Sequence, residues 1–434
     1  MADAPDPPAE SAPPVSEART PPIWWRHEVA LPVAVGLLVR LVWILVCRNE
    51  PTSDQVIYHY SATWFVERLG YVDAEGNPAG YWPVGYVVLL APFYAVLGAH
   101  PTVAFFMNAL LGGLTIFTTY GLTRTLFGAR AARAAAWVVA LLPTFVLYTT
   151  CIASENAVLP GLVGAVWLMA IPTGTTNREE RRRVFLDAGA GIVLALTAYV
   201  RGTAMPFVLI PLALGIRAPR RALGRVGFIA ACVFLLMLPW GLRNKQHFGT
   251  FSLTSINAGA NLWMGNHAGS DGMAADLPKD LPSGLAAKDK VLRARAVEYL
   301  KLYPEEALRL VVKRVWVTMR SDTIAAGWNQ VGLRSRFGGR GVAIAKGICT
   351  LGYYSLLGLA ALGIWRRRRA AVLDAGDLTL FLSACLVAAP FVLIVGGNRY
   401  QMPMQPFLAA WAGAWLAGRW SFQRQELSRA AGQR

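Results

Sequence analysis

Two acidic residues of this chain lie close to the ends of long apolar runs. Asp54 follows the first run, and Glu155 lies in the turn between two later runs. A carboxylate that is partly removed from water is suited to take a proton from an alcohol. The alternatives are a solvated loop acid or a helix N-cap, and Glu155 is well placed to be a cap. Spacing alone favours these structural roles.

Four basic residues also lie beyond the ends of apolar runs, on the side where these acids are expected: Arg201, Arg243, Lys245 and Arg399. Arginine can hold a phosphate group through two parallel hydrogen bonds. The alternative is that each side chain extends to the lipid headgroups. Arg40 lies inside the first run and needs a partner within the bundle.

The composition indicates a membrane protein. The chain has 434 residues, of which 55% are hydrophobic and 15% charged, and its mean hydropathy is +0.40. The net charge of +17 comes from 42 Lys and Arg against 25 Asp and Glu. Soluble domains average about 25% charged residues. These values exclude a disordered acidic protein, a disulfide scaffold and an ordinary cytosolic enzyme. The five cysteines fall in apolar runs and read as small hydrophobic residues.

Ten apolar runs approach the roughly 20 residues that a helix needs to cross a bilayer. The predicted spans are Val29–Cys47, Thr102–Thr123, Ala134–Cys151, Ala157–Ile171, Leu186–Val200, Ala204–Ile216, Val226–Trp240, Val342–Trp365, Leu378–Gly396 and Met402–Gly418. The fold class expected is an all-α, polytopic integral-membrane bundle.

Arginine clusters set the expected orientation. They occur at residues 124–133, 178–183, 217–225 and 366–369, and from Arg419 onward. With ten spans and a cytoplasmic N-terminus, every cluster lies in the cytoplasm, as the positive-inside rule requires. An eleventh run, Val84–Ala99, would reverse this orientation if it crossed. We therefore expect it to be a juxtamembrane helix at the outer surface.

The chain divides into five regions on this basis. Residues 1–22 are rich in Pro, Ala and Ser and predict a disordered cytoplasmic tail. Residues 23–242 form a transmembrane module with an outer loop at 48–101. Residues 243–340 form an outer-face region with helices at 286–303 and from Pro304, and residues 341–418 return to the membrane, followed by a cytoplasmic tail at 419–434. One face of the helix after Pro304 is expected to dock on the membrane or the bundle; it carries Leu308, Val311, Val312, Val315, Trp316 and Met319.

Several short motifs, in this order, resemble one superfamily of membrane enzymes. They are Ser53-Asp54-Gln55, Gly80-Tyr81-Trp82-Pro83-Val84-Gly85-Tyr86, Leu126-Phe127-Gly128-Ala129-Arg130, Ser154-Glu155 with Pro160, Pro239-Trp240-Gly241-Leu242-Arg243-Asn244, the stretch Ser255 to Asn266, and Arg399-Tyr400-Gln401-Met402-Pro403. Their order and spacing resemble the GT-C superfamily of polyprenyl-phosphate-sugar-dependent glycosyltransferases, and within it the protein O-mannosyltransferase and aminoarabinose transferase group.

The resemblance implies roles for particular residues. Asp54 matches an acid of the first outer loop that acts as base or positions the acceptor, and Glu155 matches a second acid. Arg399 and Tyr400 match a region near the donor phosphate. Aminoarabinose transferases carry a Lys-Pro pair in the first loop, where this chain has Trp82-Pro83 preceded by Tyr81. Phosphate binding is then expected to depend on Arg201, Arg243, Lys245 and Arg399.

These observations predict a glycosyltransferase of the bacterial cytoplasmic membrane. It would transfer a sugar, with inversion, from a polyprenyl-phosphate donor to a hydroxyl of a lipid, protein or polysaccharide acceptor at the outer face. The expected sugar and acceptor contacts are Tyr58, Tyr81, Trp82, Asn261, Trp263 and Asn266.

The alternative class is a lipid-linked saccharide flippase or other secondary transporter, which usually shows inverted repeats or broken helices. No cofactor is indicated by a nucleotide or metal motif, although a divalent metal near Asp54 and Glu155 stays open. Nucleic-acid binding is not expected, because the basic clusters are separated by spans.

Overall fold

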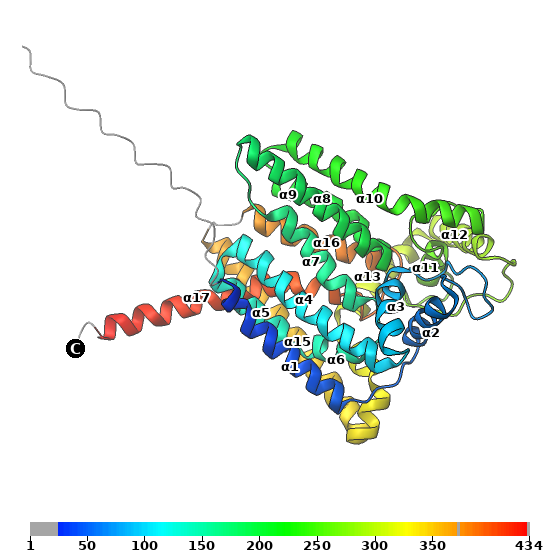
Figure 1. Cartoon of the computed structure of the whole chain (residues 1–434), viewed down its shortest axis with the longest axis horizontal. Coiled ribbons are helices and arrows are strands. Elements are labelled where there is room, and N and C mark those ends of the chain that lie inside the picture. The colour runs from blue at the N-terminus through cyan, green and yellow to red at the C-terminus, as the bar shows by residue number, and fades with distance from the viewer. Residues whose placement is uncertain (1–24, 371–373, 432–434) are drawn as a thin grey trace, which may run out of the picture.

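The computed structural model describes residues 25–370 and 374–431, and these are almost entirely helical (Figure 1). The predicted tail at 1–22 lies outside the described residues. An isolated bridge between Val72 and Pro78 is the one β-type pairing in the described part. The helices of the bundle are α1 (Trp25–Val46), α4 (Pro101–Phe127), α5 (Ala129–Leu141), α6 (Pro143–Leu147), α7 (Glu155–Ala170), α8 (Asn177–Val200), α9 (Ile210–Leu214), α10 (Pro219–Phe248), α15 (Gln330–Arg369), α16 (Ala375–Leu393) and α17 (Gln405–Ala431).

Shorter elements complete the chain. They are α2 (Asp54–Arg68), α3 (Gly85–Leu97), α11 (Ala258–Gly265), α12 (Leu285–Leu302), α13 (Pro304–Met319), α14 (Ile324–Trp328) and the 3₁₀ turns η1 (Tyr148–Thr150), η2 (Gly202–Leu209) and η3 (Met402–Met404). Figure 1 shows α2, α3, α11 and α12 gathered at one end of the bundle, opposite the C-terminal end of α17.

The all-helical prediction is confirmed, and helices occupy all ten predicted spans. Six described helices have the length and apolar character to cross a membrane, and a seventh candidate is the pair Ala129–Leu141 and Pro143–Thr150, bent by 51°. The other expected spans fall on α17 and on shorter helices, namely α7 and the η2–α9 segment. The count of ten crossings and the placement of α3 at the outer surface stay predictions.

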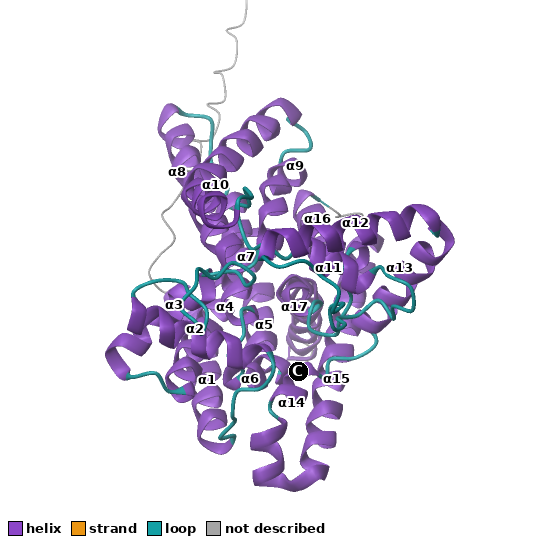
Figure 2. Ribbon diagram, turned by 90° about the vertical axis from the view of Figure 1, so that its right-hand side faces the viewer, coloured by secondary structure: helices purple, strands orange, loops and turns teal. Residues whose placement is uncertain are grey.

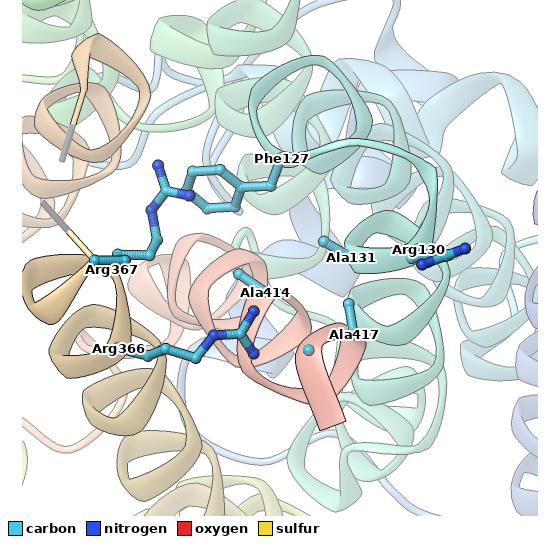
Figure 3. A pocket seen from close by; sticks show the side chains of 10 residues that line it. Phe127, Arg130, Ala131, Arg366, Arg367, Ala414 and Ala417 are labelled. Atoms are coloured by element: carbon cyan, nitrogen blue, oxygen red, sulfur yellow. The ribbon is translucent and has the colours of Figure 1, made fainter. Parts of the chain in front are cut away.

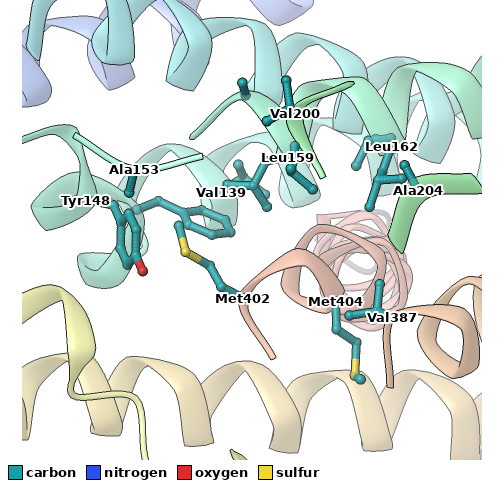
Figure 4. Close-up of a cluster of buried hydrophobic side chains, with 14 of the residues drawn as sticks. Val139, Tyr148, Ala153, Leu159, Leu162, Val200, Ala204, Val387, Met402 and Met404 are labelled. Carbon is teal, nitrogen blue, oxygen red and sulfur yellow. The ribbon is translucent and has the colours of Figure 1, made fainter. Parts of the chain in front are cut away.

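Small side chains let the bundle helices approach closely, as is common in membrane proteins. A Cβ added at Gly413 of α17 would lie 2.4 Å from the carbonyl oxygen of Ala131 in α5, and one added at Gly363 of α15 would lie 2.2 Å from that of Trp411. Larger side chains fill the centre, where Val139, Leu159, Leu162 and Met402 meet from different helices (Figure 4).

Glycine also breaks α15. Gly338 has φ 67° and ψ −175°, so the segment consists of two helices joined at this residue. This left-handed φ is readily adopted by glycine. The first of these helices lies beside α14 at the base of the view in Figure 2, and the second contains the predicted span 342–365.

Arg40, whose partner the sequence does not reveal, donates to backbone carbonyls. Its Nη1 lies 2.9 Å from Gly36 O and 3.0 Å from Ala140 O, while its Nε has no partner among the described residues. These contacts tie α1 to α5.

The expected helices of the region 243–340 are confirmed as α12 and α13. Within the predicted apolar face of α13, Leu308, Val312 and Trp316 are exposed and do not pack on the bundle, whereas Met319 does. Docking of the exposed part on the membrane stays a prediction. The bundle contact is also made by Leu310, Arg314 and Val317, which are buried.

Candidate active site

Three helix ends and one loop at the α2–α12 end of the bundle bring opposite charges together. Asp54 is the first residue of α2, and Glu155 is the first residue of α7. Arg201 follows α8, where its extended backbone (φ −157°, ψ 116°) ends the helix. Arg399 lies in the loop between α16 and η3. We call these four residues the charged cluster; they are separated by up to 345 positions in the sequence.

The charged cluster is a row in which acids and arginines alternate. Asp54 accepts a hydrogen bond from Nη1 of Arg399. Nε of Arg399 lies 4.0 Å from Oε1 of Glu155, and Nη2 of Arg201 lies 2.8 Å from the same oxygen. Arg201 also donates to the hydroxyl of Ser154 at 3.1 Å. The structure therefore brings together both predicted acids and two of the four predicted cations.

Aromatic rings surround the two arginines. The Tyr400 ring centroid lies 5.2 Å from Cζ of Arg399 and 5.8 Å from Cζ of Arg201, and Trp328 lies 5.3 Å from Cζ of Arg399. At these distances the rings attract the cations electrostatically and hold the guanidinium planes in place. The hydroxyl of the buried Tyr148 has no hydrogen-bond partner among the described residues.

The electrostatics keep the arginines charged and the nearby phenols neutral. Burial disfavours the charged form of Arg399, but Tyr400, Glu155 and Asp54 more than offset this and raise its pKa well above the ordinary value. Burial raises the pKa of Tyr58 to about 12. Tyr58 therefore stays protonated at neutral pH and can donate a hydrogen bond.

The first loop places three predicted contact residues beside the charged cluster. The Tyr58 and Trp82 rings meet edge to face at 6.0 Å, and those of Trp82 and Tyr81 at 5.4 Å. Burial raises the pKa of Tyr81, and the charges of Asp289 and Asp54 add to this shift. Tyr81 therefore lies within electrostatic reach of the catalytic candidate Asp54.

The other predicted residues lie away from the charged cluster. Arg243 donates to Ala79 O at 2.7 Å and to Tyr71 O at 3.2 Å, and it stacks on Trp240. It therefore fastens the first loop to α10. Lys245 is exposed on the same helix.

Three predicted contact residues on or beside α11 also lie away from the charged cluster. Asn266 donates to Ile394 O at 3.0 Å and accepts from Arg314, so it joins α11 to α16 and α13. The Trp263 ring stacks on that of His267 at 4.1 Å. The side chain of Asn261 is partly exposed.

A segment that the sequence analysis did not single out supports the arginine loop. Asn398 donates to Thr323 Oγ1 at 2.7 Å, and Gln401 donates to Ser321 O at 3.2 Å. Asp322 accepts from Gln405 at 2.8 Å and from Thr144 at 2.6 Å. Residues 321–323 thus hold both sides of the Arg399-Tyr400 corner.

The donor set does not fit a divalent metal ion. Among the residues that the structure describes, no three His, Cys, Asp or Glu side chains come together. Asp54 and Glu155 are both engaged by arginines, whose positive charge opposes a second cation.

Two cavities lie outside the charged cluster. One of about 310 Å³ lies at the opposite end of the bundle, where Arg130, Arg366 and Arg367 are among its lining residues (Figure 3). Another of about 330 Å³ lies beside α12 and includes Asp289 and Arg293. Neither is lined by a residue of the charged cluster.

Residues 82–241 match the model of the dolichyl-phosphate-mannose-protein mannosyltransferase family. No curated protein matches the sequence. Among solved structures, the chain is similar to the archaeal oligosaccharyltransferase AglB from Archaeoglobus fulgidus in complex with an inhibitory peptide and a dolichol-phosphate. That match has a TM-score of 0.58 and 16% identity, and it covers 95% of this chain and 52% of the other. ArnT from Cupriavidus metallidurans, bound to undecaprenyl phosphate, matches with a TM-score of 0.46 and 17% identity over 91% of this chain and 78% of the other.

The chain spans about half the length of AglB, and at 16% identity the likeness is one of fold. Together with the match to the mannosyltransferase family model, this fold confirms the resemblance to the GT-C superfamily of membrane glycosyltransferases. The protein is a multi-pass membrane protein of this fold.

Proposed function

We propose that this protein transfers a sugar from a polyprenyl-phosphate donor to an acceptor hydroxyl at the outer face of a bacterial cytoplasmic membrane. The observation that carries the proposal is the charged cluster, in which Asp54 and two arginines meet at the end of the bundle away from the arginine clusters. This reaction requires a carboxylate that takes the proton of the acceptor hydroxyl and cations that stabilise the leaving phosphate. The GT-C fold supports the same reaction class.

In the proposed reaction Asp54 takes the proton of the acceptor hydroxyl. The acceptor oxygen forms a bond to the anomeric carbon while the bond from that carbon to the phosphate oxygen breaks. The electron pair of the broken bond leaves with the polyprenyl phosphate. A single displacement of this kind inverts the anomeric configuration.

The arginines stabilise the leaving phosphate. Charge develops on the phosphate oxygen as its bond to the sugar breaks, and fixed cations in a site with limited water stabilise such charge strongly. Arg399 and Arg201 are both mostly buried, with side chains 20% exposed. Glu155 keeps Arg201 in place through their 2.8 Å ion pair.

Aromatic side chains of the first loop would contact the sugar or the acceptor. Tyr58, Trp82 and Tyr81 form a continuous row of rings, and both tyrosines lie within electrostatic reach of Asp54. The apolar faces of sugar rings stack well on such surfaces, and the neutral Tyr58 hydroxyl can donate a hydrogen bond. The donated sugar and the acceptor could be identified by mass spectrometry of envelope glycolipids and glycoproteins from cells that lack this protein.

The test is the substitution Asp54→Asn. Loss of a general base reduces transfer by about 10² to 10⁴-fold, whereas the protein should stay folded and in the membrane. Glu67→Gln is the matched control, because Glu67 is an exposed acid of the same helix. Full transfer by Asp54→Asn at normal protein levels would contradict the role of Asp54. Movement of a lipid-linked sugar across liposomes without transfer would favour the flippase alternative.

A further inference from the structure

Both arginines of the charged cluster are already bound by carboxylates. The cluster contains two acids and two guanidiniums, and every ion pair in it joins one of each. An incoming phosphate therefore competes with an acid for each guanidinium. The chemical question is which of the two acids gives way.

The two acids differ in how firmly they are held. The Glu155 side chain is 1% exposed, contacts both arginines and lies 3.4 Å from the hydroxyl of Ser154. The Asp54 side chain is 18% exposed, and Arg399 is its one hydrogen-bonding partner among the described residues. A buried carboxylate that loses its cation pays a large desolvation cost, and a partly exposed one can be solvated by water. Asp54 is therefore the acid that is easier to displace.

The backbone around Asp54 also favours its release. Asp54 is the first residue of α2, so its carboxylate lies next to the positive end of the helix dipole. The N-cap Ser53 makes no side-chain hydrogen bond to the helix, which leaves the first N–H groups of α2 uncapped by that residue. Ser53 has φ 54°, an uncommon conformation for a residue other than glycine. A freed Asp54 carboxylate thus remains stabilised at the start of α2.

We propose that the donor phosphate displaces Asp54 from Arg399, and that Asp54 becomes available to the acceptor hydroxyl only after this exchange. This inference rests on the function proposed above. Glu155 stays paired with Arg201 throughout and fixes the second cation. Before the donor binds, Arg399 masks the base. After transfer the polyprenyl phosphate departs, Asp54 passes its proton to solvent water, and the original ion pair forms again.

The test measures binding of undecaprenyl phosphate to the purified full-length protein in detergent, with undecaprenol as the uncharged probe. Asp54→Asn removes the competing carboxylate, so it should lower the Kd for undecaprenyl phosphate by roughly three- to tenfold, which corresponds to the strength of a partly exposed ion pair. The same variant loses transfer. Asp54→Ser, which also lacks the charge but has a different shape, should tighten binding as well. Binding of undecaprenol should not change.

Glu155→Gln is the matched control for charge. It removes the same single negative charge from the same cluster, so simple relief of repulsion would tighten phosphate binding by both substitutions equally. The exchange predicts that Glu155→Gln does not tighten binding, because Arg201 loses the group that positions it. Thermal unfolding of each variant verifies that the compared proteins are folded.

Two results overturn the exchange. One is equal tightening by Asp54→Asn and Glu155→Gln, and the other is unchanged or weaker binding by both Asp54 variants when wild type binds normally. In either case the proposed function survives, because wild type still binds the phosphate. Absence of phosphate-dependent binding by wild type and by all variants overturns the proposed function together with the exchange.

Discussion

The two ends of the bundle both contain ion pairs between arginine and aspartate, and they differ in how many contacts hold the aspartate. At the end opposite the charged cluster, Asp187 accepts from Arg225 at 2.9 Å through both carboxylate oxygens and pairs with Arg183 at 3.1 Å. Arg183 and Arg225 also donate to carbonyls at the end of α7, those of Leu168, Met169 and Ile171. These contacts join α7, α8 and α10.

In the charged cluster, Asp54 has fewer fixed contacts than Asp187 has at the other end. Asp54 has one hydrogen-bonding partner among the described residues, and Arg399 comes from a loop rather than from the middle of a helix. Aromatic rings instead of carbonyls surround its arginines. An aspartate held by several hydrogen bonds stabilises the fold, while one held by a single arginine can give up that arginine to a ligand. The following predictions, in order of decreasing effect, test this difference.

Replacing one arginine at each end should separate activity from stability. Arg399→Ala is expected to lower transfer by about 10² to 10³-fold, because it removes a cation that stabilises the leaving phosphate. Arg225→Ala should leave transfer per folded molecule close to wild type and lower the thermal unfolding temperature. Transfer assays in membranes, normalised to folded protein, measure both. The comparison fails if Arg225→Ala reduces transfer as much as Arg399→Ala does.

Asp187→Asn should be one of the most destabilising conservative changes in the bundle. It leaves Arg183 and Arg225 without a carboxylate in a place where the Asp187 side chain is 4% exposed. Breaking a buried pair in this way costs about 3 to 5 kcal/mol. Thermal unfolding of the purified protein in detergent measures the change in stability. Asp280→Asn is the control, since the side chain of Asp280 in its pair with Arg295 is 70% exposed, and it should have little effect.

Asp322 should make stability depend on pH. Burial raises the pKa of Asp322 from 3.8 to about 6, against the smaller opposing effects of its hydrogen bonds from Thr144 and Gln405. Because the pKa is raised in the folded state, the stabilisation is complete below pH 3.8 and is lost as the pH rises through about 6. A shift of this size corresponds to about 3 kcal/mol.

Asp322→Asn removes the titrating group and should flatten that dependence. The unfolding temperature of the variant relative to wild type should therefore rise between pH 4 and pH 7. A difference between the two proteins that does not change with pH would contradict the assignment. The neighbouring Thr323→Val variant removes a hydrogen bond to Asn398 without removing a titrating group, so its effect should not depend on pH.

Arg243→Ala should have the smallest effect on phosphate binding. Its guanidinium donates to carbonyls of the first loop and does not contact the charged cluster. We expect a loss of about 1 kcal/mol in stability from these hydrogen bonds and no change in the Kd for undecaprenyl phosphate. If Arg243→Ala changed the Kd for undecaprenyl phosphate as much as Arg399→Ala does, Arg243 would also contact the phosphate.

The sequence predicted the side of the membrane that these charged residues share better than it predicted which of them contact one another. The positive-inside rule makes Arg201, Arg243, Lys245 and Arg399 exceptional in the same way, because each is predicted to lie on the side where arginine and lysine are not expected. The rule gives a side of the membrane and no lateral position. Only the packing of α2, α7, α8 and the 396–401 loop separates Arg201 and Arg399 from the other two.

The residues that support the site left little signal in the sequence. Asp322 and Trp328 lie in the segment between α13 and α15, with no motif or periodic pattern around them. Their partners, Thr144 and Arg399, are distant in the chain. The helices themselves were predictable, because runs of apolar residues and arginine clusters are local features. The α13 face was predictable as amphipathic, but its buried side depends on Arg314, which reaches Val392 and Gly265.

The equal number of acids and arginines in the charged cluster affects how a ligand arrives. Opposite charges this close cancel at a distance, so the field of the cluster weakens steeply and gives little electrostatic guidance to a phosphate in bulk water. A phosphate anchored by a lipid chain needs no such guidance, because the membrane confines it near the cluster and raises its effective concentration. If the proposed function holds, the neutral cluster gives a soluble sugar phosphate no electrostatic guidance, and the rate of donor capture should depend little on ionic strength.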